Sequence, residues 1–235
     1  MPVNHDLSLR DRLSRWLLPP RCLACDEPSR TIDLCDSCRA ALPHNLPACP
    51  CCALPLAEPA PACGECLASR PSFTRSIAPW RYEGVIAHLI PRLKFHRELA
   101  IAHTLGTLAA QQLADWPGWQ DAHCLIPLPL HPARLGQRGY NQALELARPL
   151  ARIRNLPIDT STLSRIRPTL PQTDLDAAAR RRNLRGAFAA EKITGKIVIL
   201  IDDVITTGTT AREAARVLIQ AGAAEVRVMA LARAP

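Results

Sequence analysis

The chain has 235 residues, a formal net charge of +8 and 48% hydrophobic residues, a composition that fits a folded globular protein and excludes a disordered one. This length suits one α/β domain with a small additional module. No apolar run approaches the roughly 20 residues that a membrane helix needs, and the N-terminus lacks the apolar core of a signal peptide. We therefore expect a cytoplasmic protein without a membrane span.

The positive charge is local and consists mostly of arginine. Of the 29 basic residues, only Lys94, Lys192 and Lys196 are lysines. Residues 130–185 contain eleven Arg against four acidic residues, a surplus of +7 out of the total of +8. Arginine suits bidentate phosphate contacts, so this field favours pyrophosphate-containing ligands or nucleic acid. The alternative, for any single arginine outside a motif, is that it lies on a solvent-exposed helix surface and binds no ligand.

Residues 1–21 are expected to form a short amphipathic helix. Ser8 resembles an N-cap with the acidic Asp11 three positions later, and Pro19-Pro20 stops the helix. The apolar residues that share one helical face are Leu9, Leu13, Trp16 and Leu17. We favour packing of so short a helix on the rest of the protein, while the arginines opposite its apolar face leave a membrane-surface role open.

Four Cys-x-x-Cys pairs dominate residues 22–70. They are Cys22/Cys25, Cys35/Cys38, Cys49/Cys52 and Cys63/Cys66. In a reducing compartment such pairs favour metal binding over disulfides, and two pairs supply four thiolates for one tetrahedral Zn²⁺. The eight thiolates therefore predict two structural zinc sites, which stabilise a segment with too few large apolar residues to fold alone.

Two ways of pairing these Cys-x-x-Cys knuckles are open. Consecutive pairing gives a double zinc ribbon, whereas interleaved pairing gives a cross-braced module. We favour consecutive pairing, because its loops enclose only nine and ten residues. Cys51 is the odd residue: it could replace Cys52, but Cys49-x-x-Cys52 keeps the spacing of the other three pairs.

A larger domain is expected over residues 76–235, after a linker rich in Ser, Pro and Arg at residues 67–75. Residues 77–82 are predicted to form a strand. An apolar helical pattern then leads to Lys94, a candidate ligand contact, and residues 99–116 form the longest predicted helix.

A basic loop is predicted between a short strand at residues 124–127 and a helix from about residue 140 to 154. It carries candidate pyrophosphate-binding residues, followed by two further candidate ligand contacts: Arg134, Arg138 and Gly139, then Asn141 and Gln142. Arginine beside glycine at a helix entrance can offer side-chain charge and backbone amides to the same anion. A basic helix start on the surface is the alternative, although the helix dipole disfavours cations there unless an anion is present.

A second polar cluster follows, and it includes the candidate ligand contacts Arg165 and Arg182. The other members are Arg167, Thr169, Gln172, Thr173 and the arginines near Gly186. So many polar residues close to this glycine predict a mobile flap.

The central motif begins with five apolar residues, Ile197 to Ile201, which are typical of a strand covered on both faces in a parallel sheet. Asp202 and Asp203 follow at the carboxyl end of this strand, where open α/β sheets bind ligands. Small and hydroxyl residues then lead into a helix predicted over residues 211–221: Thr206, Thr207, Gly208, Thr209 and Thr210. Such a helix start is suited to an anion. The alternative is an ordinary strand, turn and N-cap.

The stretch from Val198 to Thr210 resembles the phosphoribosyl pyrophosphate (PRPP) loop of type I phosphoribosyltransferases. The resemblance implies that Asp202 and Asp203 bind the ribose hydroxyls as catalytic residues. It also implies that residues 206–210 hold the 5′-phosphate of PRPP, which binds together with Mg²⁺. A final strand predicted over residues 226–231 completes a βαβ unit around this loop.

Several motifs together, from Cys22 to Arg233, resemble the ComF family, also called ComFC or GntX-like proteins. They are the four Cys-x-x-Cys pairs, the stretches 127–142, 165–172 and 182–188, and the PRPP-like loop. The resemblance implies a type I phosphoribosyltransferase-like parallel sheet with flanking helices, preceded by a small zinc-ribbon module with four-cysteine sites. It also implies a link to competence, the handling of imported single-stranded DNA.

Two functions from different classes follow from this resemblance. The first is a phosphoribosyltransferase, in which Arg134 and Arg138 stabilise the departing pyrophosphate. The second is a non-catalytic protein that binds single-stranded DNA, with competence-machinery proteins as partners. The chain has only four Trp, three Phe and two Tyr, which weakens the base-stacking part of the second hypothesis.

Overall fold

The computed structural model describes residues 20–29, 32–168 and 184–235. Most of the helix expected at residues 1–21 lies outside these ranges. The same is true of Thr169, Gln172, Thr173 and Arg182 from the second polar cluster. Among the residues described, none of the helices combines the length and the apolar character needed to cross a membrane.

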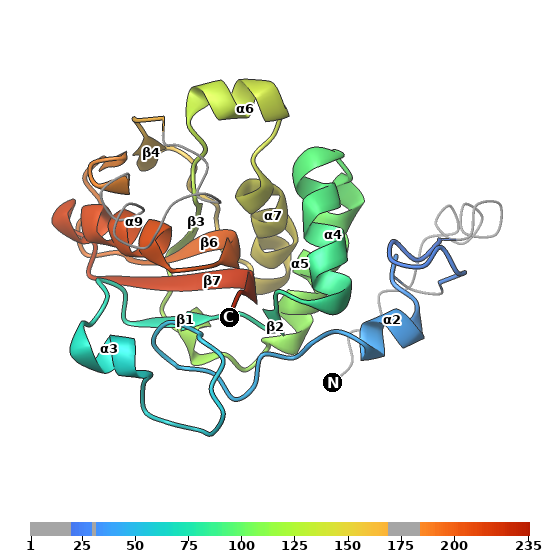
Figure 1. Ribbon diagram of the computed structural model, residues 1–235. Helices are drawn as coiled ribbons and strands as arrows, with labels where there is room; N and C mark the ends of the chain where they lie inside the picture. The colour runs from blue at the N-terminus through green and yellow to red at the C-terminus, as the bar shows by residue number, and fades with distance from the viewer. Residues whose placement is uncertain (1–19, 30–31, 169–183) are drawn as a thin grey trace.

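A parallel sheet forms the centre of the larger domain (Figure 1). Its strand order is β1 (Arg75–Ile77), β7 (Glu225–Arg233), β6 (Ile197–Ile205) and β3 (Cys124–Pro127), and β2 (Trp80–Arg81) also pairs with β7. All of these pairings are parallel. The sheet confirms the predicted α/β class.

Helices cover both faces of this sheet, as Figure 1 shows. They are α4 (Gly84–Phe95), α5 (Leu99–Gln112) and α7 (Gln142–Arg154) on one face and α9 (Thr209–Gln220) on the other. Along β6, Ile199 and Ile201 join the core under α4, α5 and α7, whereas Val198 and Leu200 join the core under α9. The run reads as continuously apolar because both faces of the strand are buried.

Several element boundaries differ from those predicted. Strand β6 continues past both aspartates, because Val204 and Ile205 still pair with β7. The strand expected at residues 77–82 is divided into β1 and β2 on either side of Pro79, which has no N–H to donate to a ladder. Helix α7 begins at Gln142, because the Asn141 side chain caps it by accepting a hydrogen bond from the Ala143 amide at 3.0 Å.

The basic loop predicted after β3 is instead partly helical. Helix α6 (Pro132–Arg138) has proline at its first position, and it ends at Gly139, whose φ of 82° is a left-handed conformation that glycine adopts easily. Arg134 and Arg138 therefore stand on one short helix. The residues that flank the expected flap pair as two antiparallel strands, β4 (Leu163–Arg165) and β5 (Phe188–Ala190).

The cysteine-rich module has two short helices, α2 (Asp36–Ala40) and α3 (Gly64–Ala68). A 3-10 helix, η1 (Pro117–Trp119), precedes β3 in the larger domain. Cys124, which lies outside the cysteine-rich module, is buried in β3 with 4% of its surface exposed.

Candidate functional site

The two adjacent carboxylates of Asp202 and Asp203 lie on β6 just beyond the point where the neighbouring strand β3 ends. Strand β3 ends at Pro127, opposite Ile201, and the Leu128 amide makes the last bond of this ladder to the Ile201 carbonyl at 2.9 Å. Asp202 and Asp203 come next, on opposite faces of the strand. The end of β3 opens the space into which such carboxylates can bind a ligand.

Asp203 is paired with a lysine from another element. The Lys94 ammonium, in the last turn of α4, lies 2.9 Å from an Asp203 carboxylate oxygen, and both side chains are largely buried. Burial opposes the charge on Lys94, but the Asp203 and Asp202 carboxylates outweigh that effect and raise the pKa of Lys94. The lysine is therefore charged, and it offsets part of the negative charge at the site.

The protonation of Asp202 is unusual. Burial, together with the neighbouring charge of Asp203, raises the pKa of Asp202 from 3.8 to about 7, and Lys94 acts in the opposite direction. The Asp202 carboxylate accepts a hydrogen bond from the Asp203 amide at 2.8 Å. Asp202 can thus exchange a proton near neutral pH, and a ligand that brings a cation or hydroxyl donors would favour its charged form.

The loop after β6 has the features of an anion site. Gly208 adopts a left-handed conformation with φ of 70°, and α9 begins at the next residue. The hydroxyls of Thr207 and Thr209 are 2.8 Å apart and hydrogen-bond to each other across the turn. Amides at the start of a helix carry partial positive charge and suit a phosphate.

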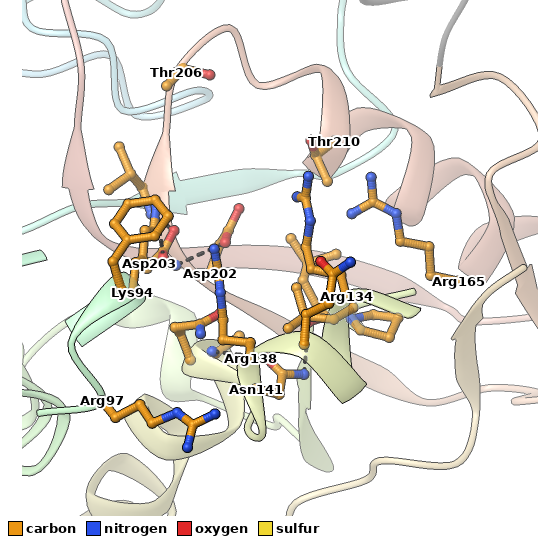
Figure 2. A pocket seen from close by; sticks show the side chains of 18 of the residues that line it. Lys94, Arg97, Arg134, Arg138, Asn141, Arg165, Asp202, Asp203, Thr206 and Thr210 are labelled. Carbon is orange, nitrogen blue, oxygen red and sulfur yellow. Dashed lines mark hydrogen bonds and ion pairs between the residues drawn. The ribbon is translucent and has the colours of Figure 1, made fainter. Parts of the chain in front are cut away.

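A cavity of about 930 Å³ brings together most of the residues selected from the sequence. Those that line it are Lys94, Arg134, Arg138, Asn141, Gln142, Arg165, Asp202, Asp203, Thr206 and Thr210. Four selected residues do not line the cavity: Thr207 and Gly208 in the loop after β6, Thr209 at the start of α9, and Gly139 at the end of α6. In Figure 2 the side chains of Arg134 and Arg138 extend from α6 toward the part of β6 that bears Asp202 and Asp203.

The arginines face the carboxylates across this cavity. Arg138 donates a hydrogen bond to the Gln142 side-chain oxygen at 2.8 Å, and its guanidinium lies 5.4 Å from the centre of the Phe95 ring. Burial and the nearby charge of Arg134 lower the pKa of Arg138. Burial and Arg134 also lower the pKa of Arg165 on β4. Three positively charged side chains, Arg134, Arg138 and Arg165, therefore line one cavity and favour an anionic ligand there.

Two predicted contacts also have structural roles. Asn141 caps α7, and its amide nitrogen donates to the Leu128 carbonyl at 3.1 Å. Gln142 is 3% exposed, and its side-chain nitrogen makes no hydrogen bond to any described residue although its oxygen accepts one from Arg138. Gln142 lines the cavity, and a buried donor without a partner beside a polar cavity is unusual in a folded protein.

The residues selected from the sequence do not include several that line the cavity, among them Tyr82, Phe95, Arg97 and Gln137. Phe95 is 71% exposed at the end of α4, which is unusual for a large aromatic side chain. The signal that could have found Phe95 and Arg97 is their position beside Lys94. Tyr82 and Gln137 come from elements whose positions depend on tertiary packing.

The cysteines form the two clusters that consecutive pairing predicts. One cluster contains Cys22, Cys25, Cys35 and Cys38, and the other contains Cys49, Cys52, Cys63 and Cys66. Within each cluster all sulfur atoms lie within 4.8 Å of one another. The distances of 3.7 Å for Cys25–Cys35 and 3.5 Å for Cys52–Cys63 suit a tetrahedral zinc ion, whose ~2.3 Å bonds to sulfur give an S–S separation of roughly 3.8 Å. Cys51 belongs to neither cluster.

Comparison with known proteins agrees with this architecture. Residues 13–67 match the double zinc ribbon domain, and residues 141–235 match the phosphoribosyl transferase domain. The solved structure of glutamine PRPP amidotransferase from B. subtilis, complexed with ADP and GMP, aligns with 55% of this chain at 25% identity and a TM-score of 0.38. This chain covers 26% of that structure.

Curated relatives match over most of their length. DNA utilization protein YhgH from Salmonella typhimurium is 36% identical over 204 residues, which are 85% of this chain and 90% of the relative. Competence protein F from Haemophilus influenzae is 34% identical over 208 residues, with 86% and 90% covered. Competence protein ComFC from Bacillus subtilis is 28% identical, with 81% and 80% covered. The chain therefore belongs to the ComF family, with a double zinc ribbon ahead of a domain of the type I phosphoribosyltransferase fold.

Proposed function

We propose that the cavity binds phosphoribosyl pyrophosphate, or a related ribose phosphate, together with Mg²⁺, in a role linked to DNA uptake and use. The observation that carries this proposal is the position of the Asp202–Asp203 pair, between the loop at residues 206–210 and the arginines of α6. A ligand with vicinal hydroxyls between two phosphate groups matches this order, because its hydroxyls would face the aspartates and its phosphates would face the loop and the arginines.

Each part of the ligand has a matching group in the site. The ribose hydroxyls would donate hydrogen bonds to the two aspartates, and the 5′-phosphate would accept them from the backbone amides and hydroxyls of residues 206–210. The pyrophosphate would lie against Arg134 and Arg138, and its oxygens together with the aspartates are the hard ligands that Mg²⁺ prefers.

If the protein transfers the phosphoribosyl group, these residues also have a chemical role. The bond from the anomeric carbon to pyrophosphate would break with its electron pair moving to the pyrophosphate oxygen, and a nucleophilic atom of the acceptor would form the new bond to that carbon with its own electron pair. Arg134 and Arg138 would stabilise that negative charge, and Asp202 and Asp203 would lie beside the ring as positive charge develops. Mg²⁺, when bound, would supply further charge neutralisation on the pyrophosphate.

Calorimetric titration with PRPP and Mg²⁺ tests the site. The double variant Asp202→Asn, Asp203→Asn should bind roughly 30- to 150-fold more weakly, because each asparagine still accepts a hydrogen bond but loses the charge assistance, which is about 1–1.5 kcal/mol per bond. Asp121→Asn is the control, since Asp121 is exposed, has a φ of 57° that asparagine tolerates, and precedes β3 at the opposite end of the sheet. Equal affinity of the wild type and the double variant would refute the proposal.

A second candidate function is binding of single-stranded DNA without catalysis. It is favoured by the names of the relatives, a DNA utilization protein and competence proteins, and by the arginine surplus of residues 130–185. Binding through phosphates releases counterions, so the affinity for an oligonucleotide should fall steeply between about 50 and 200 mM salt. Fluorescence anisotropy measures this, and a flat salt response would exclude the phosphate-based mode.

A further inference from the structure

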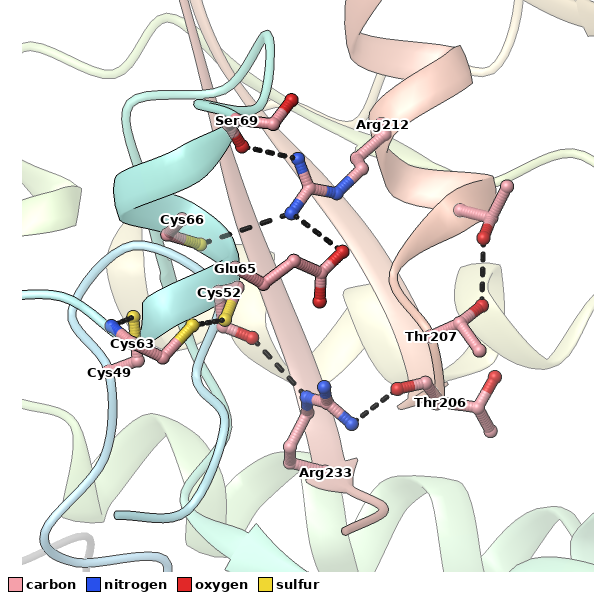
Figure 3. A network of polar contacts seen from close by, with 11 residues as sticks. Cys49, Cys52, Cys63, Glu65, Cys66, Ser69, Thr206, Thr207, Arg212 and Arg233 are labelled. Carbon is pink, nitrogen blue, oxygen red and sulfur yellow. Dashed lines mark hydrogen bonds and ion pairs between the residues drawn. The ribbon is translucent and has the colours of Figure 1, made fainter. Parts of the chain in front are cut away.

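The second cysteine cluster lies against the loop of the candidate ligand site, as Figure 3 shows. Arg233, the last residue of β7, is 5% exposed and connects the two. It donates hydrogen bonds to the Cys52 carbonyl at 3.4 Å and to the Ile205 carbonyl at 3.3 Å, and also to the Thr206 carbonyl. One buried guanidinium thus contacts a Cys-x-x-Cys knuckle and the first residue of the loop.

A second arginine makes a similar connection on the far side of the loop. Arg212, in the first turn of α9, donates to the Ser69 carbonyl at 3.2 Å and lies 3.9 Å from the Cys66 sulfur. It also pairs with Glu65 at 3.5 Å. The loop is therefore tied to the second zinc ribbon both where it leaves β6 and where it enters α9.

The first cluster has different neighbours. Its ribbon meets the larger domain through Arg92 of α4, which donates to the Leu23 carbonyl, and through Cys22 and Leu34, which join the core under α4 and α5. These contacts lie away from residues 206–210. The chain thus has two similar cysteine clusters. Only the second is connected to the loop of residues 206–210 by Arg233 and Arg212, so the first serves as an internal control.

Metal binding fixes the position of such a knuckle, because a ribbon with four cysteine ligands draws most of its folding free energy from the ion. Without metal, the Cys52 carbonyl and the Cys66 sulfur would no longer be held in place. Arg233 would then lose an acceptor while remaining buried, which is unfavourable for a charged group. The loop would be freed from one of its two supports.

We propose that a zinc ion at the second cluster and an anion at the loop bind cooperatively, with Arg233 and Arg212 as the positioning residues that couple them. The identity of the anion rests on the function proposed above, but the coupling of the metal to the loop does not. Linkage is reciprocal, so a ligand that binds more tightly to the metal-loaded protein must also tighten metal binding.

Hydrogen exchange on the ligand-free, zinc-loaded protein tests the role of Arg233. Arg233→Met should accelerate exchange over residues 204–213 by tenfold or more. Arg227→Met is the matched control: Arg227 is also buried on β7, at 6% exposed, but it donates to the Gly118 and Gln120 carbonyls instead. Equal exchange of residues 204–213 in the two variants would overturn the proposal. If Arg233→Met does not fold, Arg212→Gln is expected to give the same local effect.

Metal ligands provide the second test. Cys66→Ser should loosen residues 204–213, whereas Cys25→Ser, at the first cluster, should leave them unchanged. In the wild type, which should hold two zinc ions per chain, PRPP with Mg²⁺ should slow zinc loss to a chelator from the second cluster by tenfold or more, and not from the first. Loosening by both substitutions, or by neither, would overturn the coupling. Failure of PRPP to bind would contradict the proposed ligand instead, and the exchange results would still decide the coupling.

Discussion

Asp202 lines the candidate ligand site, and its carboxylate destabilises the folded protein at neutral pH. Its pKa of about 7 lies above the ordinary value of 3.8, so the folded protein holds this proton more tightly than the unfolded chain does. The contribution of the protonated side chain to stability is complete below about pH 4, and it is lost as the pH rises toward 7. A half-buried carboxylate that weakens the fold at neutral pH is typical of a functional position.

Asp202→Asn should therefore stabilise the protein at pH 8 and change little at pH 4. Asparagine keeps the acceptor for the Asp203 amide and removes the unfavourable charge. We expect a gain in the free energy of unfolding of about 1–3 kcal/mol at pH 8, allowing for partial exposure of the side chain. Urea denaturation at the two pH values measures it. If Asp202→Asn destabilised the protein equally at both pH values, the raised pKa of Asp202 in the folded protein would be contradicted.

At the residue scale, the sequence was informative where chemistry follows directly from a local motif. The acidic pair, the threonine-rich loop and the Cys-x-x-Cys pairs are each contiguous, and the structure brings most of the selected side chains to one cavity. Phe95 could not be selected by type, because an aromatic residue at the end of an apolar helix is usually buried. Its exposure becomes evident only from the position of α4.

Helices α5 and α7 show how closely two elements of this fold approach each other. Gly106 on α5 faces α7 so closely that a Cβ atom there would lie 2.5 Å from the Pro149 side chain and 3.0 Å from the Leu146 carbonyl. Only a residue without a side chain allows this contact. Because α7 begins at Gln142, which lines the cavity, the packing of α7 on α5 also sets the position of that wall of the cavity.

Gly106→Ala should therefore destabilise the protein by about 1–3 kcal/mol, although alanine is the better helix former. Gly136→Ala on α6 is the control, since a Cβ atom there would meet nothing within 4 Å. It should be neutral or stabilising by up to about 1 kcal/mol. Thermal or urea unfolding of both variants checks the pair. A stabilised Gly106→Ala variant would show that the two helices can separate at little cost.

Element types were predictable here more often than element ends. The strand β6 and the helices α7 and α9 were all predicted as the correct type of element, but β6 runs four residues beyond Ile201, because pairing with β7 continues to Ile205. Helix α6 was missed because its seven residues are largely exposed and form no apolar stripe. Its signals were the proline at its start and the glycine that follows it.

At the scale of the whole molecule, the larger domain and the second zinc ribbon meet at the loop of residues 206–210. The two parts are stabilised in different ways. The parallel sheet is held by apolar cores on both faces, whereas the ribbon depends on its cysteine clusters. The sequence could place these modules in order along the chain. It could not show that the second cluster packs on the loop, because Arg233 and Arg212 lie more than a hundred residues from the cysteines and carry no local motif.

We propose that one cavity binds a sugar that carries a phosphate group on each side. Calorimetric titration of the wild type, in the presence of Mg²⁺, with PRPP, ribose 5-phosphate and pyrophosphate tests it most directly. We expect PRPP to bind at least tenfold more tightly than either smaller ligand, because only PRPP reaches both the loop at residues 206–210 and the arginines of α6. Equal affinities for all three ligands, or binding of none of them, would contradict it.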